Sequence, residues 1–183
     1  MDLLPWARAL AEQLLAEPLP RRWAHSQGVG LLAESLADVV GADAELLAAA
    51  AWLHDIGYSP DLVKTGMHQF DGARYLRDVA EADPRICGLV AHHSCAYVEA
   101  LNREIYPVFA KEFPHAHGLL EDALTYCDMS TTPDGELTNV NDRLAEILER
   151  YGEGTLVFDT MTEAGPFLIE AAGRISALMA TRR

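Results

Sequence analysis

Residues 45–57 read ELLAAAAWLHDIG, and this stretch decides the fold. Its run of leucine and alanine predicts a buried helix, because these residues form helices readily and leave no polar face. We expect Asp43 to cap the start of the helix and Gly57 to end it in the left-handed conformation that favours glycine. His54 and Asp55 are therefore predicted to occupy the last turn of a buried helix.

Other polar residues stand alone within apolar helical patterns on both sides of this pair. His25 shares a helical face with Val29, and Asp128 shares one with Leu124, so both polar side chains are predicted to point inward. These spacings extend the His-Asp pair into an ordered series of imidazoles and carboxylates. The other members of the series are His68, His92 and His93.

The periodicity is helical along almost the whole chain, which predicts an all-α fold. Asp83 and Pro84 are expected to begin one helix as its cap and first residue, and Pro166 is expected near the start of the last helix. Gly72 is expected to let a neighbouring helix approach closely beside His68. Residues 155–158 are the one β-like stretch, and they are too short to imply a sheet.

Length, composition and charge restrict the class of protein. A chain of 183 residues, half of them hydrophobic, suits a single domain over 1–183. The formal charge of −14 disfavours a nucleic-acid polymer as partner and leaves an anionic small molecule, provided that bound cations supply a positive field. The longest apolar run is too short to cross a bilayer, and the three cysteines fit reduced thiols, so we expect a cytoplasmic protein without membrane contact. The oligomeric state is not indicated.

The polar series favours a divalent metal ion. Nitrogen and carboxylate oxygen donors without thiolate suit hard-to-borderline divalent ions. Each histidine alone is explained as well by a hydrogen bond in the core. Asp55 and Asp128, however, lie in apolar surroundings with no arginine at helical spacing, and a buried unpaired carboxylate is costly. His115 and His117, in a loop with Pro114, are expected to be exposed to solvent instead.

These motifs resemble the HD-domain superfamily of metal-dependent phosphohydrolases over about residues 21–130, with 131–183 as variable C-terminal helices. The resemblance implies a helical bundle with a central metal site formed by His25, His54, Asp55 and Asp128. His68 and His92 match the additional histidines of the dinuclear subset, in which Asp55 bridges the two ions. The motifs that carry the resemblance are Arg22-x-x-His25-Ser26, His54-Asp55-Ile56-Gly57, His68 with Gly72-Ala73, Val90-Ala91-His92-His93, and Asp128.

The resemblance implies hydrolysis of a phosphomonoester or phosphodiester, of a nucleotide-like small molecule, by a metal-bridging hydroxide. Two divalent ions are expected, with Fe or Mn favoured over Mg, Co, Ni or Zn. Asp55 and Lys64 are the expected catalytic residues. His93 is open between a metal ligand, a substrate contact and a residue that orients its neighbour. The candidates for binding the substrate are Lys64, His93, Arg22, Arg74 and Arg143.

Two other functions fit the same residues. Some proteins of this superfamily hold a di-iron centre in the same six ligand positions and oxidise C–H bonds with O₂. A metal-bound sensing domain without catalytic activity is the third alternative. No Gly-Tyr-Pro motif follows the His-His pair, which disfavours the cyclic-dinucleotide phosphodiesterase branch.

Overall fold

The computed structural model describes residues 2–115 and 117–181, and these residues form a bundle of helices. No strand occurs among them; one isolated bridge joins Thr131 to Leu137. The all-α prediction is confirmed. The α-helices are α1 (Leu3–Leu15), α2 (Pro20–Ser35), α3 (Ala37–Val40), α4 (Ala44–Leu53), α5 (His68–Asp78), α6 (Pro84–His92), α7 (Ala96–Asn102), α8 (Tyr106–Glu112), α9 (Leu119–Met129), α10 (Val140–Tyr151) and α11 (Leu156–Thr181), with short 3₁₀ turns η1 (Gly41–Asp43), η2 (Ile56–Tyr58) and η3 (His93–Cys95).

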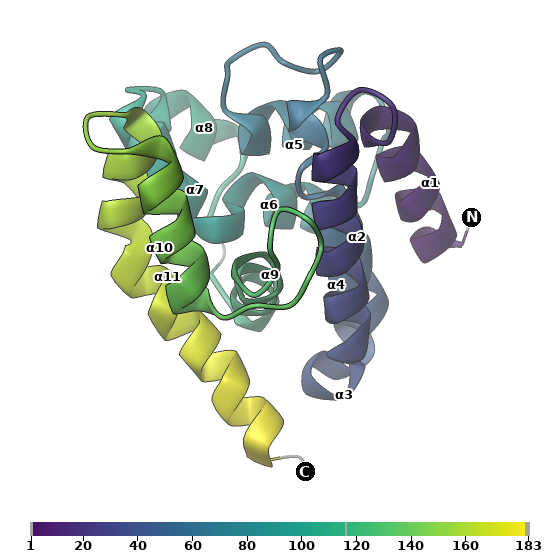
Figure 1. Cartoon of the computed structure of the whole chain (residues 1–183). Helices are drawn as coiled ribbons and strands as arrows, with labels where there is room; N and C mark the ends of the chain where they lie inside the picture. The colour runs from purple at the N-terminus through teal and green to yellow at the C-terminus, as the bar shows by residue number, and fades with distance from the viewer. Residues whose placement is uncertain (1, 116, 182–183) are drawn as a thin grey trace.

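The helices surround α9, which runs through the middle of the bundle (Figure 1). On one side α2 and α4 pack against each other and against α9, with α1 outside them. On the other side α10 and α11 form an antiparallel pair that packs on α9. None of the described helices is long and apolar enough to span a membrane.

Helix α4 is the buried centre of the N-terminal side, as its composition predicts. Its residues from Leu46 to Leu53 are all buried. Asp43 lies at the N-cap position, but its side chain makes no cap bond and accepts instead from the guanidinium of Arg85 at 2.7 Å. The prediction that the Asp43 side chain caps α4 is therefore wrong, although the helix begins where it was expected.

Gly57 is required for a different reason from the one expected. It lies within η2 and does not adopt a positive φ, so it is not a left-handed helix end. A Cβ atom at Gly57 would lie 1.9 Å from the carbonyl oxygen of His68, closer than any real contact. Gly72 faces it, with its Cβ position 3.1 Å from the Gly57 nitrogen. The two glycines thus let α5 approach the turn that follows the His-Asp pair, which confirms the close approach expected at Gly72.

Two expectations for the other helices were correct and two were not. Asp83 caps α6 through a bond from the Arg85 amide, and Pro84 follows it. The interpretation of residues 155–158 as β-like is wrong, since residues from Leu156 onward belong to α11. Pro166 lies inside that 26-residue helix and not near its start.

Candidate metal centre

Four polar side chains from three parts of the chain meet between α2, α4 and α9. His25 comes from α2, His54 and Asp55 directly follow α4, and Asp128 comes from the last turn of α9. His25 Nε2 lies 3.0 Å from Asp128 Oδ1 and 3.7 Å from Asp55 Oδ2. His54 Nε2 lies 3.3 Å from Asp55 Oδ2 and 3.9 Å from Asp128 Oδ1. All four are buried, as their helical spacing predicted.

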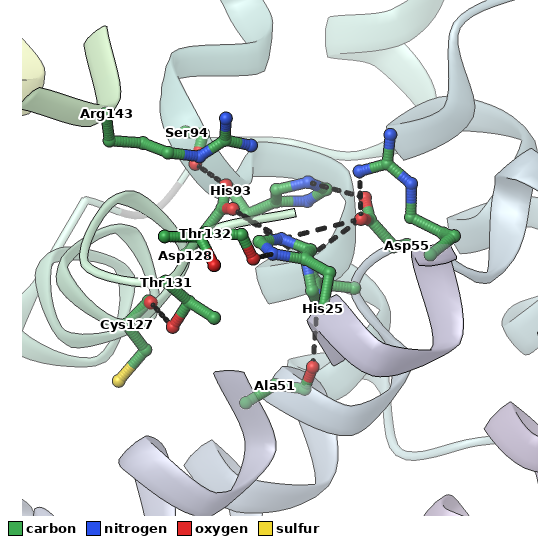
Figure 2. A network of polar contacts seen from close by, with 12 residues as sticks. His25, Ala51, Asp55, His93, Ser94, Cys127, Asp128, Thr131, Thr132 and Arg143 are labelled. Carbon is green, nitrogen blue, oxygen red and sulfur yellow. Dashed lines mark hydrogen bonds and ion pairs between the residues drawn. The ribbon is translucent and has the colours of Figure 1, made fainter. Parts of the chain in front are cut away.

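Three histidines of this region share one orientation. In each, Nδ1 lies within hydrogen-bond distance of a backbone carbonyl, at 3.0 Å for His25 and 2.7 Å for both His54 and His93. A carbonyl only accepts, so each Nδ1 carries a proton, and in the neutral imidazole the lone pair is on Nε2, which faces the centre of the group. The carbonyls are those of Thr132, Ala51 and Val90. Figure 2 shows His25, Asp55, His93 and Asp128 turned toward one another.

These tautomers are the ones that a metal ion requires. Imidazole ligands typically donate their second N–H to a carbonyl or carboxylate, which fixes the ring and leaves the other nitrogen free to coordinate. Within residues 2–115 and 117–181, the fully buried Nε2 of His54 makes no hydrogen bond, although it faces two carboxylates. A buried lone pair without a donor is costly. The donor set of His25, His54, Asp55 and Asp128 therefore fits a divalent cation.

Asp55 faces two groups of ligands through its two oxygens. Oδ2 lies toward His25 and His54, whereas Oδ1 lies 3.2 Å from His68 Nε2 and 4.0 Å from His93 Nε2. Nε2 of His68 and Nε2 of His93 are themselves 3.2 Å apart. Asp55, His68 and His93 thus form a second group of potential metal ligands that shares Asp55 with the first.

His93 occupies the place in which His92 was expected. His92 is the last residue of α6, and its Nε2 donates to the carbonyl of Phe113 at 2.8 Å, away from Asp55. The chain then leaves the helix, and Ser94 and Cys95 both adopt left-handed conformations, with φ of 51° and 59°. This turn directs the His93 ring into the centre. His92 therefore does not lie among the central group of potential ligands, whereas His93 does, and His93 also lines the hollow described below.

Ser94 is a member of the site that sequence reasoning missed. Its hydroxyl donates to Asp128 Oδ2 through a short hydrogen bond, and its amide donates to Thr125 at 3.3 Å. The left-handed turn therefore orients Asp128 as well as His93. Backbone conformations that non-glycine residues rarely adopt often occur at functional sites. A serine directly after the His-His pair was the available signal.

The electrostatics of the site favour ionised carboxylates and a neutral His93. Burial opposes ionisation of Asp55, but Arg22 and His54 outweigh it and hold the pKa of Asp55 well below its usual range. Burial likewise opposes ionisation of Asp128, and contacts with His25 and His54 lower its pKa nonetheless. Burial, with His54 and His68 nearby, lowers the pKa of His93 to about 3. Asp55 and Asp128 raise the pKa of His54 in spite of its burial. Ionised carboxylates and a neutral His93 are the states that metal ligands need, and His54 would give up its proton to a bound cation.

Arg22 neutralises Asp55 directly, which sequence spacing did not reveal. Its guanidinium lies 2.7 Å from Asp55 Oδ2 and covers the ring of Tyr58, with 4.1 Å to the centroid. Tyr58 in turn stacks on His68, with the centroids 3.9 Å apart. Arg22 borders the site as expected, and the stack of Arg22, Tyr58 and His68 fixes the His68 ring.

A hollow of about 180 Å³ opens onto Asp55, His68, His93 and Asp128. Arginines form much of its polar wall. Figure 2 shows Arg143 extending from α10 toward the site. Arg143 was predicted as a candidate, whereas Arg150, on the same helix, and Arg103, directly after α7, were not. The arginines that line the hollow are Arg22, Arg103, Arg143 and Arg150.

Two predicted cations do not reach the site. The Lys64 side chain is exposed and does not line the hollow. Its loop is held by its backbone, since the amides of Lys64, Thr65 and Gly66 all donate to the buried carboxylate of Asp71. Arg74 instead makes a two-bond ion pair with Glu112, at 2.5 and 3.0 Å. The roles expected of Lys64 and Arg74 are corrected.

A family profile described as HD domain matches residues 22–152. The chain belongs to the HD-domain superfamily of metal-dependent phosphohydrolases. The match runs beyond the expected 21–130 and includes α10, which carries Arg143 and Arg150. The HD-domain assignment agrees with the central group of histidines and aspartates.

Two curated relatives are ribonuclease Y of Mesoplasma florum, 39% identical over 69 residues, and ribonuclease Y of Rubrobacter xylanophilus, 34% identical over 70 residues. Each alignment covers 38% of this chain and only 14% of the relative. No solved structure matches the chain.

Proposed function

We propose that this HD-domain protein hydrolyses phosphate esters of small, nucleotide-like molecules with two divalent ions. One ion would be held by His25, His54, Asp55 and Asp128. The second would be held by Asp55, His68 and His93. The observation that carries the proposal is that three buried Nε2 atoms, each with its Nδ1 bonded to a backbone carbonyl, face the two aspartates.

The protein residues supply a fixed frame and a rim of arginines. Each of these arginines is paired with a carboxylate: Arg22 with Asp55, Arg103 with Glu99, and Arg143 and Arg150 with Glu146. When bound, divalent ions supply Lewis acidity toward phosphoryl oxygens and hydroxide near neutral pH. The shared carboxylate of Asp55 sets the spacing of the two ligand groups. At the rim, the planar guanidiniums suit phosphate oxygens, which they bind through two parallel bonds. Arg143 is 6% exposed, lines the hollow and is paired with Glu146, so a phosphate would compete with that carboxylate for its guanidinium.

The size and charge of the site support a small anion over a long RNA strand. The hollow of about 180 Å³ is smaller than the ~300–1,000 Å³ of typical drug-sized ligand sites. Four of the fourteen Lys and Arg residues line it, in a chain of charge −14 whose remaining surface would repel a polyanion. The arginines also favour a phosphate over an uncharged C–H substrate, and so hydrolysis over oxygenation.

The test combines metal analysis with a substrate panel. Protein purified without oxygen is analysed for metals and then assayed with Mn²⁺, Fe²⁺, Co²⁺ or Mg²⁺ on p-nitrophenyl phosphate, bis-p-nitrophenyl phosphate, mononucleotides and an RNA oligonucleotide. We expect hydrolysis of small esters. Asp55→Asn should lower turnover about 1,000-fold, or about 4 kcal/mol, and should release the central ions. Asp78→Asn, at an exposed carboxylate paired with Arg77, is the matched control and should retain both.

Different failures point to different alternatives. Absence of hydrolysis with every metal, together with O₂ consumption by the reduced iron form, would establish the oxygenase alternative. Turnover of the RNA oligonucleotide well above that of every small ester would contradict the substrate class but keep the hydrolase. Bound metal with neither activity would favour the sensing domain.

A further inference from the structure

A third group of potential metal ligands, the outer group, lies outside the central site, where the segment after α8 meets the first turn of α9. His115 and His117 come from the segment, and Glu121 comes from α9. His115 Nε2 lies 2.9 Å from both carboxylate oxygens of Glu121, and His117 Nδ1 lies 3.5 Å from Oε2. Both histidines are exposed, as expected, but the sequence did not indicate that they meet on one carboxylate.

The spacing of these atoms suits a tetrahedral ion. Zinc binds imidazole nitrogen and carboxylate oxygen at ~2.0–2.2 Å, so neighbouring ligand atoms on a tetrahedral ion are ~3.3 Å apart. The two separations from Glu121 Oε2, 2.9 and 3.5 Å, lie on either side of this value. One atom from each of the three residues lies within 4.8 Å of the others. Only small side-chain rotations would bring all three onto one ion.

The charges of the neighbouring carboxylates indicate which of them needs a cation. Asp122 is neutralised by two 2.7 Å bonds from Arg174. Glu121 is equally buried, at 8% exposure, but among residues 2–115 and 117–181 its ion-pair partners are the two histidines alone. The other ring nitrogen of His117, Nε2, lies 3.7 Å from Asp122 Oδ1. A buried carboxylate that faces two imidazoles is a donor set that suits a divalent metal.

Packing holds one of the rings in place before any ion binds. The His115 ring stacks on His92, with centroids 4.4 Å apart and planes inclined by 17°. His92 is buried and bonded to the carbonyl of Phe113, at the end of α8, so its own position is fixed. His92, which is not part of the central site, thus holds the His115 ring of the outer group in place.

We propose that His115, His117 and Glu121 bind a divalent transition-metal ion of the zinc class, separate from the central ions. Two imidazoles and one carboxylate leave a fourth position open to water. The ion would connect the segment after α8 to α9. This proposal does not depend on the hydrolase activity.

The experiment counts ions per chain in proteins that all keep the central site. The metal-free full chain is dialysed against micromolar free Zn²⁺ and analysed for zinc and protein. We expect wild type to bind one more Zn²⁺ per chain than the His115→Ala/His117→Ala double variant and than Glu121→Gln. Glu170→Gln is the matched control and should match wild type, because its exposed carboxylate on α11 lines one surface hollow together with His115, His117 and Glu121.

Equal zinc content in wild type and the double variant would overturn the proposal, as would an extra ion that binds only at millimolar Zn²⁺. Because the comparison is a difference, it holds whether the central site takes one ion or two. Metal-free melting curves establish that the variants fold. If the double variant does not fold, His117→Ala alone decides the question, since the His117 side chain is 58% exposed and its loss should still weaken Zn²⁺ binding at least 10-fold.

Discussion

His92 and His93 are neighbours in the chain, yet they belong to two different groups of histidines. His93 faces Asp55 and His68 in the interior, with its Nδ1 bonded to the Val90 carbonyl. His92 faces the other way and stacks on His115, near the surface. The end of α6 and the left-handed turn at Ser94 separate the two directions.

The comparison shows two ways in which a protein prepares histidines for a ligand. In the central site, backbone carbonyls fix the rings of His25, His54 and His93, whereas His68 is held by stacking on Tyr58. In the outer group, one ring is held by stacking and the other is mostly exposed. Preorganised ligands lose less conformational entropy on binding. We therefore expect the central site to bind metal more tightly than the outer group.

The largest effect on metal affinity should come from substituting His93, and the same experiment on its neighbour His92 should show almost none. His93→Ala removes a direct ligand and should weaken binding of the ion between Asp55 and His68 about 1,000-fold, or about 4 kcal/mol. His92→Phe keeps the stacked ring and should leave the central affinity within about 2-fold. Mn²⁺ titration of both variants measures the difference. Equal weakening in the two would mean that the histidines act as one unit.

The next largest effect should come from the close contact between Gly57 and the backbone of α5, and it should appear in the free energy of unfolding. Gly57→Ala places a methyl group against the His68 carbonyl and should lower the free energy of unfolding by about 1–3 kcal/mol. Gly88→Ala is the matched control, because nothing lies within 4 Å of its Cβ position inside α6. That change should raise stability by about 0.5–1 kcal/mol. Urea unfolding of the metal-free proteins measures both. Unchanged stability of Gly57→Ala would show that η2 and α5 move apart at little cost.

The smallest effect concerns the rim of the hollow. Arg143→Gln should lower kcat/KM for a phosphate ester about 10-fold, or about 1.4 kcal/mol, with most of the change in KM. Arg143→Lys keeps the charge and should recover part of the loss. Lys64→Ala should change neither constant, since that side chain is outside the hollow. Steady-state kinetics with central metal present measures all three. A larger loss for Lys64→Ala than for Arg143→Gln would restore the role first predicted for Lys64.

The helices could be predicted from the sequence because their patterns are local. An apolar run with capping and breaking residues at its ends specifies a buried helix such as α4 wherever it packs. Residues 155–158 were misread because β-branched and aromatic residues favour a strand over so short a window, whereas α11 gains its stability by packing along α9 and α10.

The inward direction of His25 and Asp128, and the burial of His54 and Asp55, also follow from the sequence itself, because helical periodicity places each on a face that must enter the core. Only the tertiary structure decided between His92 and His93, since that choice depends on where α6 ends and on a backbone turn that non-glycine residues rarely adopt. It also decided which cations surround the hollow. Lys64 is near the site in sequence but its side chain is exposed and outside the hollow, whereas Arg150 is far away in sequence and is brought in by α10. Long flexible cations carry no periodic signal, and their positions depend on how distant helices pack.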